Sequence, residues 1–283
     1  MIIGGEYASP EKAEIRKRLW DPAFQELVNK YNKPATDIRY LCLPGAQCIY
    51  LKHLFQDIGL PKRNVVAVEQ YEEAAIAIHH ALGGRGVTRQ GKIEELFEKR
   101  SLDKYFPFDV VDLDFCGPAF VFPRVRQGKD AKEYQRRWQT IERVLELNRS
   151  HRLKVFYLLL SIAGVRTNAP GKKFLLREIK SLNDTVGIEK NPSTWTDARL
   201  IQEVVPKLLI NEALRQDYEI SPNDFDSYRY KQQGHQYPMV AFSFRCELVE
   251  KTELGQDLEW KSEAQAVFVR TYYSKEPKEL RLS

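Results

Sequence analysis

The chain has 283 residues, of which 43% are hydrophobic and 29% are charged, and its formal net charge is +5 at pH 7. This length can bury the core of one large α/β domain, so a small scaffold that depends on disulfides or a structural metal is excluded. No stretch approaches the roughly 20 apolar residues of a membrane span, and the first residues form no basic leader or long apolar run, so we expect a soluble, cytoplasmic protein.

Two short helices are predicted at the start of the chain. Ser9 followed by Pro10 is a typical N-cap with proline at the first helical position, and Asp21 followed by Pro22 repeats this signal. We assign residues 1–36 to these amino-terminal helices.

Strands and helices then alternate five times. Apolar runs at residues 38–45, 64–70, 108–115 and 153–164 have the length of buried strands, and a weaker strand is predicted within residues 85–92. Helix-favouring segments separate them, and glycines stop the helices after the first two strands. This alternation predicts a doubly wound, mostly parallel sheet over residues 37–165.

The rest of the chain is predicted to differ from this core. Residues 166–236 have the pattern of helices, one of them kinked or split by Pro206, and we expect a helical insertion or lid. Two alternating runs, at 238–249 and 264–273, predict an antiparallel β-hairpin within residues 237–283. The fold class is therefore α/β, with a seven-stranded sheet completed by that hairpin.

The ends of the predicted strands carry the candidate site residues, because open α/β sheets bind ligands beyond the carboxyl ends of their strands. Gly45 would let the backbone approach a ligand, although Pro-Gly is also common in plain turns. Glu69 follows the second strand and suits a pair of ribose hydroxyls, or it is a solvated carboxylate at a helix start. Asp112 and Asp114 lie at the end of the fourth strand, where unpaired burial would be costly. We predict a functional role for Asp114 and leave that of Asp112 open.

A basic segment follows the fourth strand. Residues 124–154 contain ten Lys or Arg against four Asp or Glu, which is a surplus of six positive charges. Such a surplus is typical of contacts to phosphate groups, or of a solvated helix face.

The cysteines have no pattern typical of a metal or redox site. None has CxxC spacing or a nearby histidine, so we predict buried structural thiols and no metal centre. They are Cys42, Cys48, Cys116 and Cys246.

The segments LPGAQC, VEQ and DLDFCGP, which follow the first, second and fourth strands, resemble motifs of the class I S-adenosylmethionine (AdoMet) methyltransferases. In that superfamily a glycine-containing loop and an acidic residue hold the cofactor, and the fourth strand ends at the chemistry. The last segment is similar to the loop of tRNA guanosine dimethyltransferases and, more loosely, to that of amino-methylating DNA enzymes.

The resemblance implies S-adenosyl-L-methionine as the cofactor and a base nitrogen of DNA or RNA as the acceptor. Asp114 would be the catalytic residue. The residues implied for the cofactor are Pro44, Gly45, Ala46, Glu69, Gln70 and Asp112. The residues implied for the substrate are Phe115, Cys116, Gly117, Arg124 and Arg126.

Two other functions stay open at this point. The first motif contains a single glycine where the superfamily usually has two or three, which favours, as the alternative, a catalytically degenerate binding or sensing subunit of a larger assembly. A protein partner or a homo-oligomer is compatible with the sequence. An NAD-dependent enzyme is disfavoured because the GxGxxG turn is missing.

Overall fold

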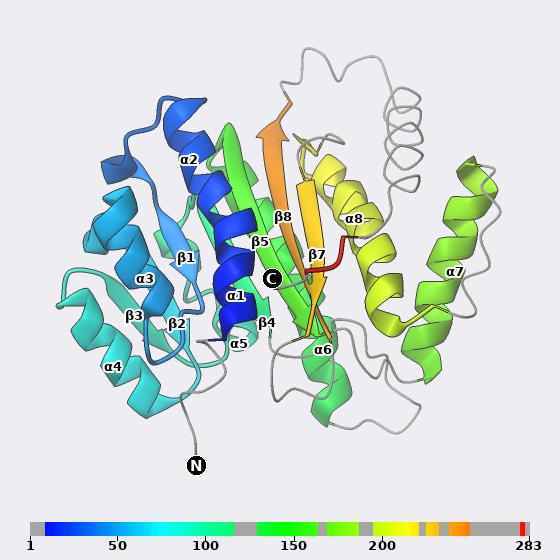
Figure 1. Ribbon diagram of the computed structural model, residues 1–283, viewed down its shortest axis with the longest axis horizontal. Helices are drawn as coiled ribbons and strands as arrows, with labels where there is room; N and C mark the ends of the chain where they lie inside the picture. Colours follow the sequence, from blue (N-terminus) through cyan, green and yellow to red (C-terminus); the bar gives the residue numbers. More distant parts are fainter. Residues whose placement is uncertain are drawn as a thin grey trace.

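The computed structural model describes residues 9–115, 129–163, 169–186, 195–220, 225–231, 238–249 and 278–280. In these ranges the strands form one eight-stranded sheet with the order β3-β2-β1-β4-β5-β8-β6, and β7 also pairs with β8 (Figure 1). The strands are β1 (Tyr40–Cys42), β2 (Val65–Glu69), β3 (Val87–Gln90), β4 (Val110–Phe115), β5 (Val155–Ala163), β6 (Tyr218–Glu219), β7 (Phe225–Tyr230) and β8 (Met239–Leu248).

The first five strands are parallel and β8 is antiparallel to β5. Strands β1 and β2 and nearly all of β5 are buried, which explains why these strands are continuous apolar runs. The antiparallel β8 distinguishes this sheet from the all-parallel sheet of dinucleotide-binding domains. The predicted α/β, mostly parallel sheet is confirmed, with one strand more than the seven we expected.

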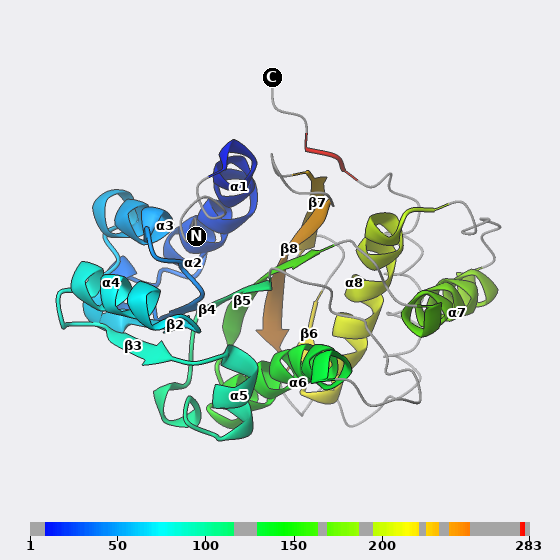
Figure 2. The same ribbon diagram turned by 90° about the horizontal axis from the view of Figure 1, so that it is seen from below.

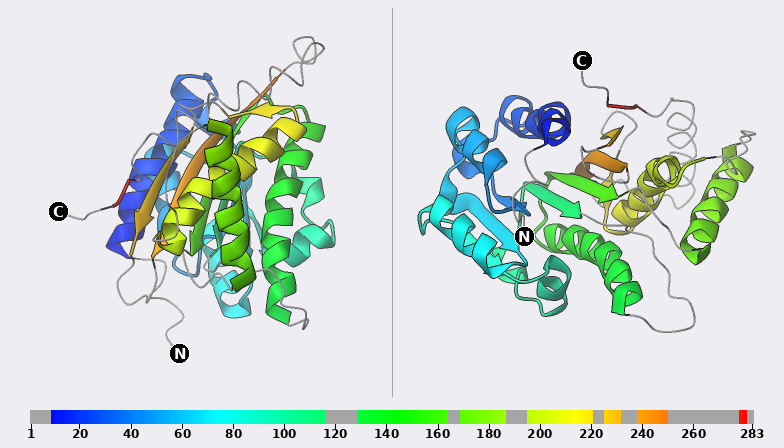
Figure 3. Two further views of the ribbon diagram at one scale, coloured as in Figure 1. Left: turned by 90° about the vertical axis from the view of Figure 1, so that its right-hand side faces the viewer. Right: turned by 60° about the horizontal axis from the view of Figure 1, so that its bottom comes forward.

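Helices cover both faces of the sheet. The first four α-helices lie on one face and α5 and α6 on the other, beside α8 (Figure 2). Helix α7 packs on α8, outside it (Figure 3). None of the helices in the described ranges is long and apolar enough to cross a bilayer. The α-helices are α1 (Pro10–Ile15), α2 (Asp21–Asn29), α3 (Ile49–His53), α4 (Glu72–Leu82), α5 (Ile93–Glu98), α6 (Lys129–Ser150), α7 (Ala169–Val186) and α8 (Asp197–Arg215).

Short π- and 3₁₀-helical turns complete the helical structure. The π-turns are η1 (Arg16–Trp20) and η3 (Leu54–Ile58), and the 3₁₀ turns are η2 (Ala35–Asp37), η4 (Lys62–Asn64) and η5 (Asp103–Tyr105).

The amino-terminal helices form one continuous run, which corrects the prediction of two separate helices. The first cap is confirmed, since the Ser9 side chain accepts a hydrogen bond from the Lys12 N–H. At the second signal, however, Trp20 is already helical and no side chain caps α2. The π-turn η1 joins the two helices, with the Asp21 N–H donating to the Arg16 carbonyl. A wider turn of this kind tolerates the proline that follows, because Pro22 has no N–H to donate.

Strands β6 and β7 lie in the range for which we predicted only helices. Both pair with β8, so this range contributes to the sheet as well as forming α7 and α8. Helix α8 contains Pro206 and is not split by it. The run at 238–249 is confirmed as β8, whereas the run at 264–273 lies outside the described residues. The observed antiparallel partners of β8 are β5, β6 and β7.

Strand β4 separates two cores by the alternation of its side chains. Val111, Leu113 and Phe115 belong to the apolar cluster beneath α5, α6 and α8. The intervening residues point toward the amino-terminal helices, where Asp112 receives a hydrogen bond from Trp20. The two aspartates of β4 therefore lie on the face that the amino-terminal helical run covers.

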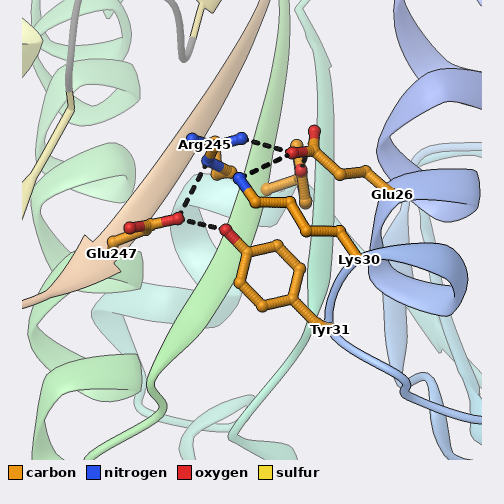
Figure 4. A network of polar contacts seen from close by, with 6 residues as sticks. Glu26, Lys30, Tyr31, Arg245 and Glu247 are labelled. Atoms are coloured by element: carbon orange, nitrogen blue, oxygen red, sulfur yellow. Dashed lines mark hydrogen bonds and ion pairs between the residues drawn. The ribbon is translucent and has the colours of Figure 1, made fainter.

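A polar network fixes the end of this helical run to β8, at the amino-terminal edge of the parallel strands (Figure 4). The Glu26 carboxylate pairs with Lys30 at 3.1 Å and also with Arg245. Arg245 pairs in turn with Glu247 at 3.0 Å, and the Tyr31 hydroxyl donates to the Glu247 carboxylate. The network holds α2 on the sheet at the end opposite to the candidate site.

Candidate functional site

A cavity of about 110 Å³ lies at the carboxyl ends of β1 to β4. This is the edge at which open α/β sheets bind their ligands. Four of the predicted site residues line this cavity, although the ends of β2 and β4 that carry them are far apart in the sequence. They are Glu69, Gln70, Asp114 and Phe115. The other residues that line it are Leu43, Val68, Gly91, Lys92, Ile93, Glu94 and Arg137.

Glu69 is the last residue of β2 and only 7% exposed. One carboxylate oxygen accepts a hydrogen bond from the Tyr71 N–H at 3.0 Å, and its carbonyl oxygen accepts from the Gly91 N–H at 2.9 Å. These bonds fix both the side chain and the strand end beside the start of α4. Glu69 is therefore a buried and oriented carboxylate in the cavity wall, rather than a solvated one.

The loop after β1 has turn geometry around Gly45. Its φ of 66° lies in the left-handed region that glycine adopts without strain, and its carbonyl accepts a hydrogen bond from the Cys48 N–H. Pro44 and Gly45 are buried and Ala46 is half-buried. The cavity is lined at this strand end by Leu43, not by these three residues.

Asp114 forms a buried ion pair with Lys12 of α1. The Lys12 Nζ lies 2.8 Å from Oδ2 of Asp114, and the two side chains are 5% and 8% exposed. Burial of a lone carboxylate at this position would be costly, and the lysine offsets that cost. Lys12 was not singled out in the sequence.

Asp112 lies deeper, under the amino-terminal helices, and does not line the cavity. Its Oδ2 accepts hydrogen bonds from the Trp20 indole N–H and the Tyr40 hydroxyl, both at 2.9 Å. Its Oδ1 is buried and has no hydrogen-bond partner among the described residues. Burial, and then the charge of Asp114, raise the pKa of Asp112 to about 6. The structure thus does not place Asp112 where the implied cofactor contact would require it.

Two further charged residues of the cavity, Glu94 and Arg137, were not among our candidates. The Arg137 Nε donates to Glu94 at 3.0 Å, and its guanidinium lies 5.4 Å from the centre of the Phe115 ring. The only signals in the sequence were that Glu94 is the first carboxylate after the third strand and that Arg137 lies in the basic segment. Together they fix one face of Phe115 at the cavity.

Several arginines of the basic segment form ion pairs with carboxylates. Arg137 pairs with Glu94, Arg143 with Asp103 and Glu146, and Arg149 with Asp217. These three arginines link α6 to neighbouring elements. Contact of the basic segment with phosphate groups stays a prediction. The substrate residues predicted in the fourth-strand loop lie outside the described residues: Cys116, Gly117, Arg124 and Arg126.

Three of the cysteines are free, buried thiols, as we predicted: Cys42, Cys48 and Cys246. The fourth, Cys116, lies outside the described residues. Over the described ranges, no three His, Cys, Asp or Glu side chains come together in a group that could hold a metal ion.

Comparison with known proteins gives matches to solved structures alone. No protein-family model matches the chain, and no curated protein matches it. TYW2 of M. jannaschii in complex with AdoMet shares 10% identity with a TM-score of 0.43, over 86% of this chain and 78% of that one.

Two RNA methyltransferases give similar values. A putative RNA methyltransferase from Pyrococcus horikoshii shares 13% identity with a TM-score of 0.41, over 88% of this chain and 90% of that one. A variant of the 16S rRNA (adenine(1408)-N(1))-methyltransferase from Catenulisporales acidiphilia shares 15% identity with a TM-score of 0.36, over 84% and 92%. The strand order of the sheet, rather than these matches, identifies the fold.

Proposed function

We propose that this chain is an S-adenosyl-L-methionine-dependent methyltransferase that modifies a base nitrogen of nucleic acid. The observation that carries the proposal is the cavity at the carboxyl ends of β1 to β4, where Glu69 and Asp114 meet. The sheet around it, with an antiparallel β8 beside β5, is the one that the sequence motifs imply.

The residues present fit part of this cofactor. When bound, it supplies a methyl group on a cationic sulfonium. The cavity is lined by more carboxylates than cationic side chains, which suits the ribose hydroxyls and the positive sulfonium of the cofactor. The carboxylates are Glu69, Glu94 and Asp114, and the cationic side chains are Lys92 and Arg137. Ligand pockets usually measure about 300–1,000 Å³, so the cavity of 110 Å³ suits a ribose-sized group better than the whole molecule.

Glu69 is the residue that we assign to the cofactor ribose. A buried carboxylate held by a backbone N–H can accept hydrogen bonds from two neighbouring hydroxyls without further ordering. Gln70 borders the same cavity, and we retain Pro44, Gly45 and Ala46 as backbone contacts of the cofactor. Asp112 is not part of this proposal.

Asp114 is the residue that we assign to the acceptor. Its carboxylate, held in place by Lys12, can accept a hydrogen bond from an amino group and raise the electron density on nitrogen. Phe115, at the same strand end, offers a ring for stacking, and Arg137 fixes it from one side. Alignment of the reactants is the main contribution that such a site makes to a displacement reaction.

One observation favours a second function, a binding subunit without catalysis. The same ion pair occupies Asp114 with a lysine of its own chain, which can equally be a purely structural contact. The buried free thiols support our expectation of a cytoplasmic location in either case.

Calorimetry with AdoMet and S-adenosylhomocysteine tests the proposal. Glu69→Ala should weaken AdoMet binding by about 1.5–3 kcal/mol, the value of charge-assisted hydrogen bonds. Glu72→Ala removes an exposed carboxylate from the first turn of α4 and is the matched control. Absence of binding by the unaltered protein would favour the binding-subunit function. Transfer of tritiated methyl groups to pools of DNA, tRNA and ribosomal RNA would then identify the acceptor.

A further inference from the structure

Helix α7 carries a row of positive charge on its outer side. Of its described side chains, at positions 172–180, the exposed ones are Lys173, Arg177 and Lys180, and all three are cations. Their spacing of four and then three residues places them on one face of the helix, over about 10 Å. This row lies opposite to Leu175 and Ile179, which are fully buried in the apolar cluster.

The row begins near the edge of the sheet that carries the candidate site. Strand β5 ends at Ala163, at the carboxyl edge, and α7 starts six residues later at Ala169. The helix then extends along the outside of α8 (Figure 3). A long ligand at the carboxyl edge can therefore contact both the candidate site and the outer face of α7.

The described carboxylates do not neutralise this row. Lys173 and Lys180 form no ion pair with any described residue. Arg177 lies 3.6 Å from Glu178, which is longer than a hydrogen bond, and Glu178 already pairs with Lys207 at 2.9 Å. The three arginines of α6 described above differ, since each of them is paired with a carboxylate. The outer face of α7 therefore keeps a surplus of positive charge.

Such a row is unfavourable for an isolated helix. Like charges three or four residues apart repel each other and destabilise a helix. A solvated helix face usually alternates cations with carboxylates, which removes this repulsion. A bound polyanion removes it as well, and the regularly spaced phosphates of a nucleic-acid strand match cations that lie along one line.

We infer that the outer face of α7 binds the sugar-phosphate backbone of a single-stranded nucleic acid. The two lysines supply point charges, and the planar Arg177 guanidinium can donate two N–H groups to one phosphate. The Phe174 ring, whose centre is 5.3 Å from this guanidinium, helps to position it. A single strand fits because the row is one helix face wide, and because its bases need no unpairing to reach Asp114. This assignment deepens the proposed function and rests on it, because it gives the strand that carries the acceptor base a contact outside the cavity.

Binding of single strands of about 20 nucleotides to the full chain, measured by fluorescence anisotropy over a range of salt concentrations, tests the inference. RNA and DNA of the same sequence are compared, and both should depend on the row because the contacts are to phosphate. The row variant is Lys173→Gln with Arg177→Gln and Lys180→Gln. It should raise the Kd about tenfold or more at low salt. The slope of log K against log salt should fall by about 2, since each of the three lost contacts contributes roughly 0.7.

A matched control removes the same charge from exposed positions at the amino-terminal edge of the sheet. It is Arg85→Gln with Lys99→Gln and Lys104→Gln. This control should leave the salt slope unchanged. Thermal unfolding checks that both variants are folded, and the row variant should be at least as stable as the unaltered protein because a repulsion is removed.

The outcomes separate this inference from the proposed function. If the row variant keeps the salt slope of the unaltered protein, the inference is wrong even if AdoMet binds and methyl groups are transferred. If strand binding depends on the row while AdoMet does not bind, the surface stands and the methyltransferase proposal fails.

Two further measurements test what kind of surface this is. In a methyl-transfer assay, the row variant should raise the KM for the strand and leave kcat unchanged, and a lowered kcat with an unchanged KM would contradict a docking role. Polyglutamate is the probe for an acidic polypeptide. If it binds as tightly as the strand and with the same dependence on the three cations, the surface recognises acidic polypeptides and the inference is overturned.

Discussion

At the amino-terminal edge of the sheet, the carboxylates of Glu26 and Asp109 have a donor on each oxygen. One carboxylate oxygen of Glu26 accepts hydrogen bonds from Lys30 and Arg245, and the other accepts one from the Tyr157 hydroxyl. One carboxylate oxygen of Asp109 accepts a hydrogen bond from Lys33, and the other accepts one from the Arg39 backbone N–H at 2.8 Å.

At the carboxyl edge, Asp112 and Glu11 each keep one buried oxygen without a hydrogen-bond partner among the described residues. A satisfied carboxylate holds elements together, whereas an unsatisfied one costs stability until a ligand or a proton arrives. The two edges therefore differ in how completely their buried carboxylates are paired.

The two edges also shift carboxylate pKa values in opposite directions. For Glu26, partial burial acts to raise the pKa, but the hydrogen bonds from Tyr157 and Lys30 and the charge of Arg245 outweigh it and the pKa is lowered. For Asp112, burial and the charge of Asp114 outweigh the neutral donors and the pKa is raised to about 6. The pKa of Glu26 is lowered because its donors and cations together outweigh partial burial, whereas the pKa of Asp112 is raised because burial outweighs its donors and the charge of Arg16.

The largest expected effect is on the buried ion pair of the carboxyl edge. Lys12→Met leaves Asp114 buried without its cation and should lower the free energy of unfolding by about 3–5 kcal/mol. Lys12→Met combined with Asp114→Asn should lose less than the sum of the two single changes. Urea unfolding measures each variant, and Lys17→Met, at an exposed position of the same helical run, is the control. A Lys12→Met loss no larger than that of the control would contradict the role of the pair.

The next effect concerns pH and Asp112. Its pKa is about 6 in the folded chain and about 4 when unfolded, so the folded state binds the proton more tightly. Its contribution to stability is therefore present below pH 4 and is lost as the pH rises through 6, by on the order of 3 kcal/mol. Asp112→Asn removes this titration, so the difference in unfolding free energy between the variant and the unaltered protein should change by that amount between pH 4 and 7. A difference that stays constant across this range would refute the assignment.

A smaller effect is expected at the amino edge. Arg245→Met removes the cation shared by Glu26 and Glu247, which are themselves partly exposed, so the loss of unfolding free energy should be about 1–2 kcal/mol. Ligand affinities at the carboxyl edge should be unchanged once the chain is folded. A weakened affinity for AdoMet in this variant would show that the two edges are not independent.

The smallest effect is expected for Tyr31→Phe. The change deletes one partly buried hydrogen bond to Glu247 and should cost about 0.5–1.5 kcal/mol. The midpoint of urea unfolding should fall with no change in its slope. A loss as large as that of Arg245→Met would mean that Tyr31, not the arginine, is the main support of Glu247.

The core of the fold was predictable because it depends on local patterns. Buried strands such as β2 and β5 are continuous apolar runs, and Gly59 and Gly83 stop the helices where they were expected, with positive φ values of 81° and 60°. Strand β7 was missed because FDSYRY is neither an apolar run nor a strict alternation, since the polar Asp226 and Ser227 are adjacent. Its pairing with β8 decides its structure, and that pairing is not visible locally.

The candidate site was predictable only in part. Glu69 and Asp114 were found because a carboxylate directly after a buried strand is a local signal. The Lys12 partner of Asp114 is 102 residues away in the sequence, and only the packing of α1 on the sheet brings it there. The place of Asp112 was likewise decided by Trp20 and Tyr40, which cover it from other elements.

The unbroken helical run from α1 through η1 to α2 has a consequence for amide hydrogen exchange. At about 1.5 Å per residue the run from Pro10 to Asn29 extends roughly 30 Å, and it links Lys12 at one edge of the sheet to Glu26 at the other. Because no loop interrupts it, we expect its amides to be protected as one cooperative unit with a single opening free energy. Removal of the Glu26–Arg245 ion pair would then lower the protection of the amides around Lys12 against exchange, although these amides lie at the far end of the helical run.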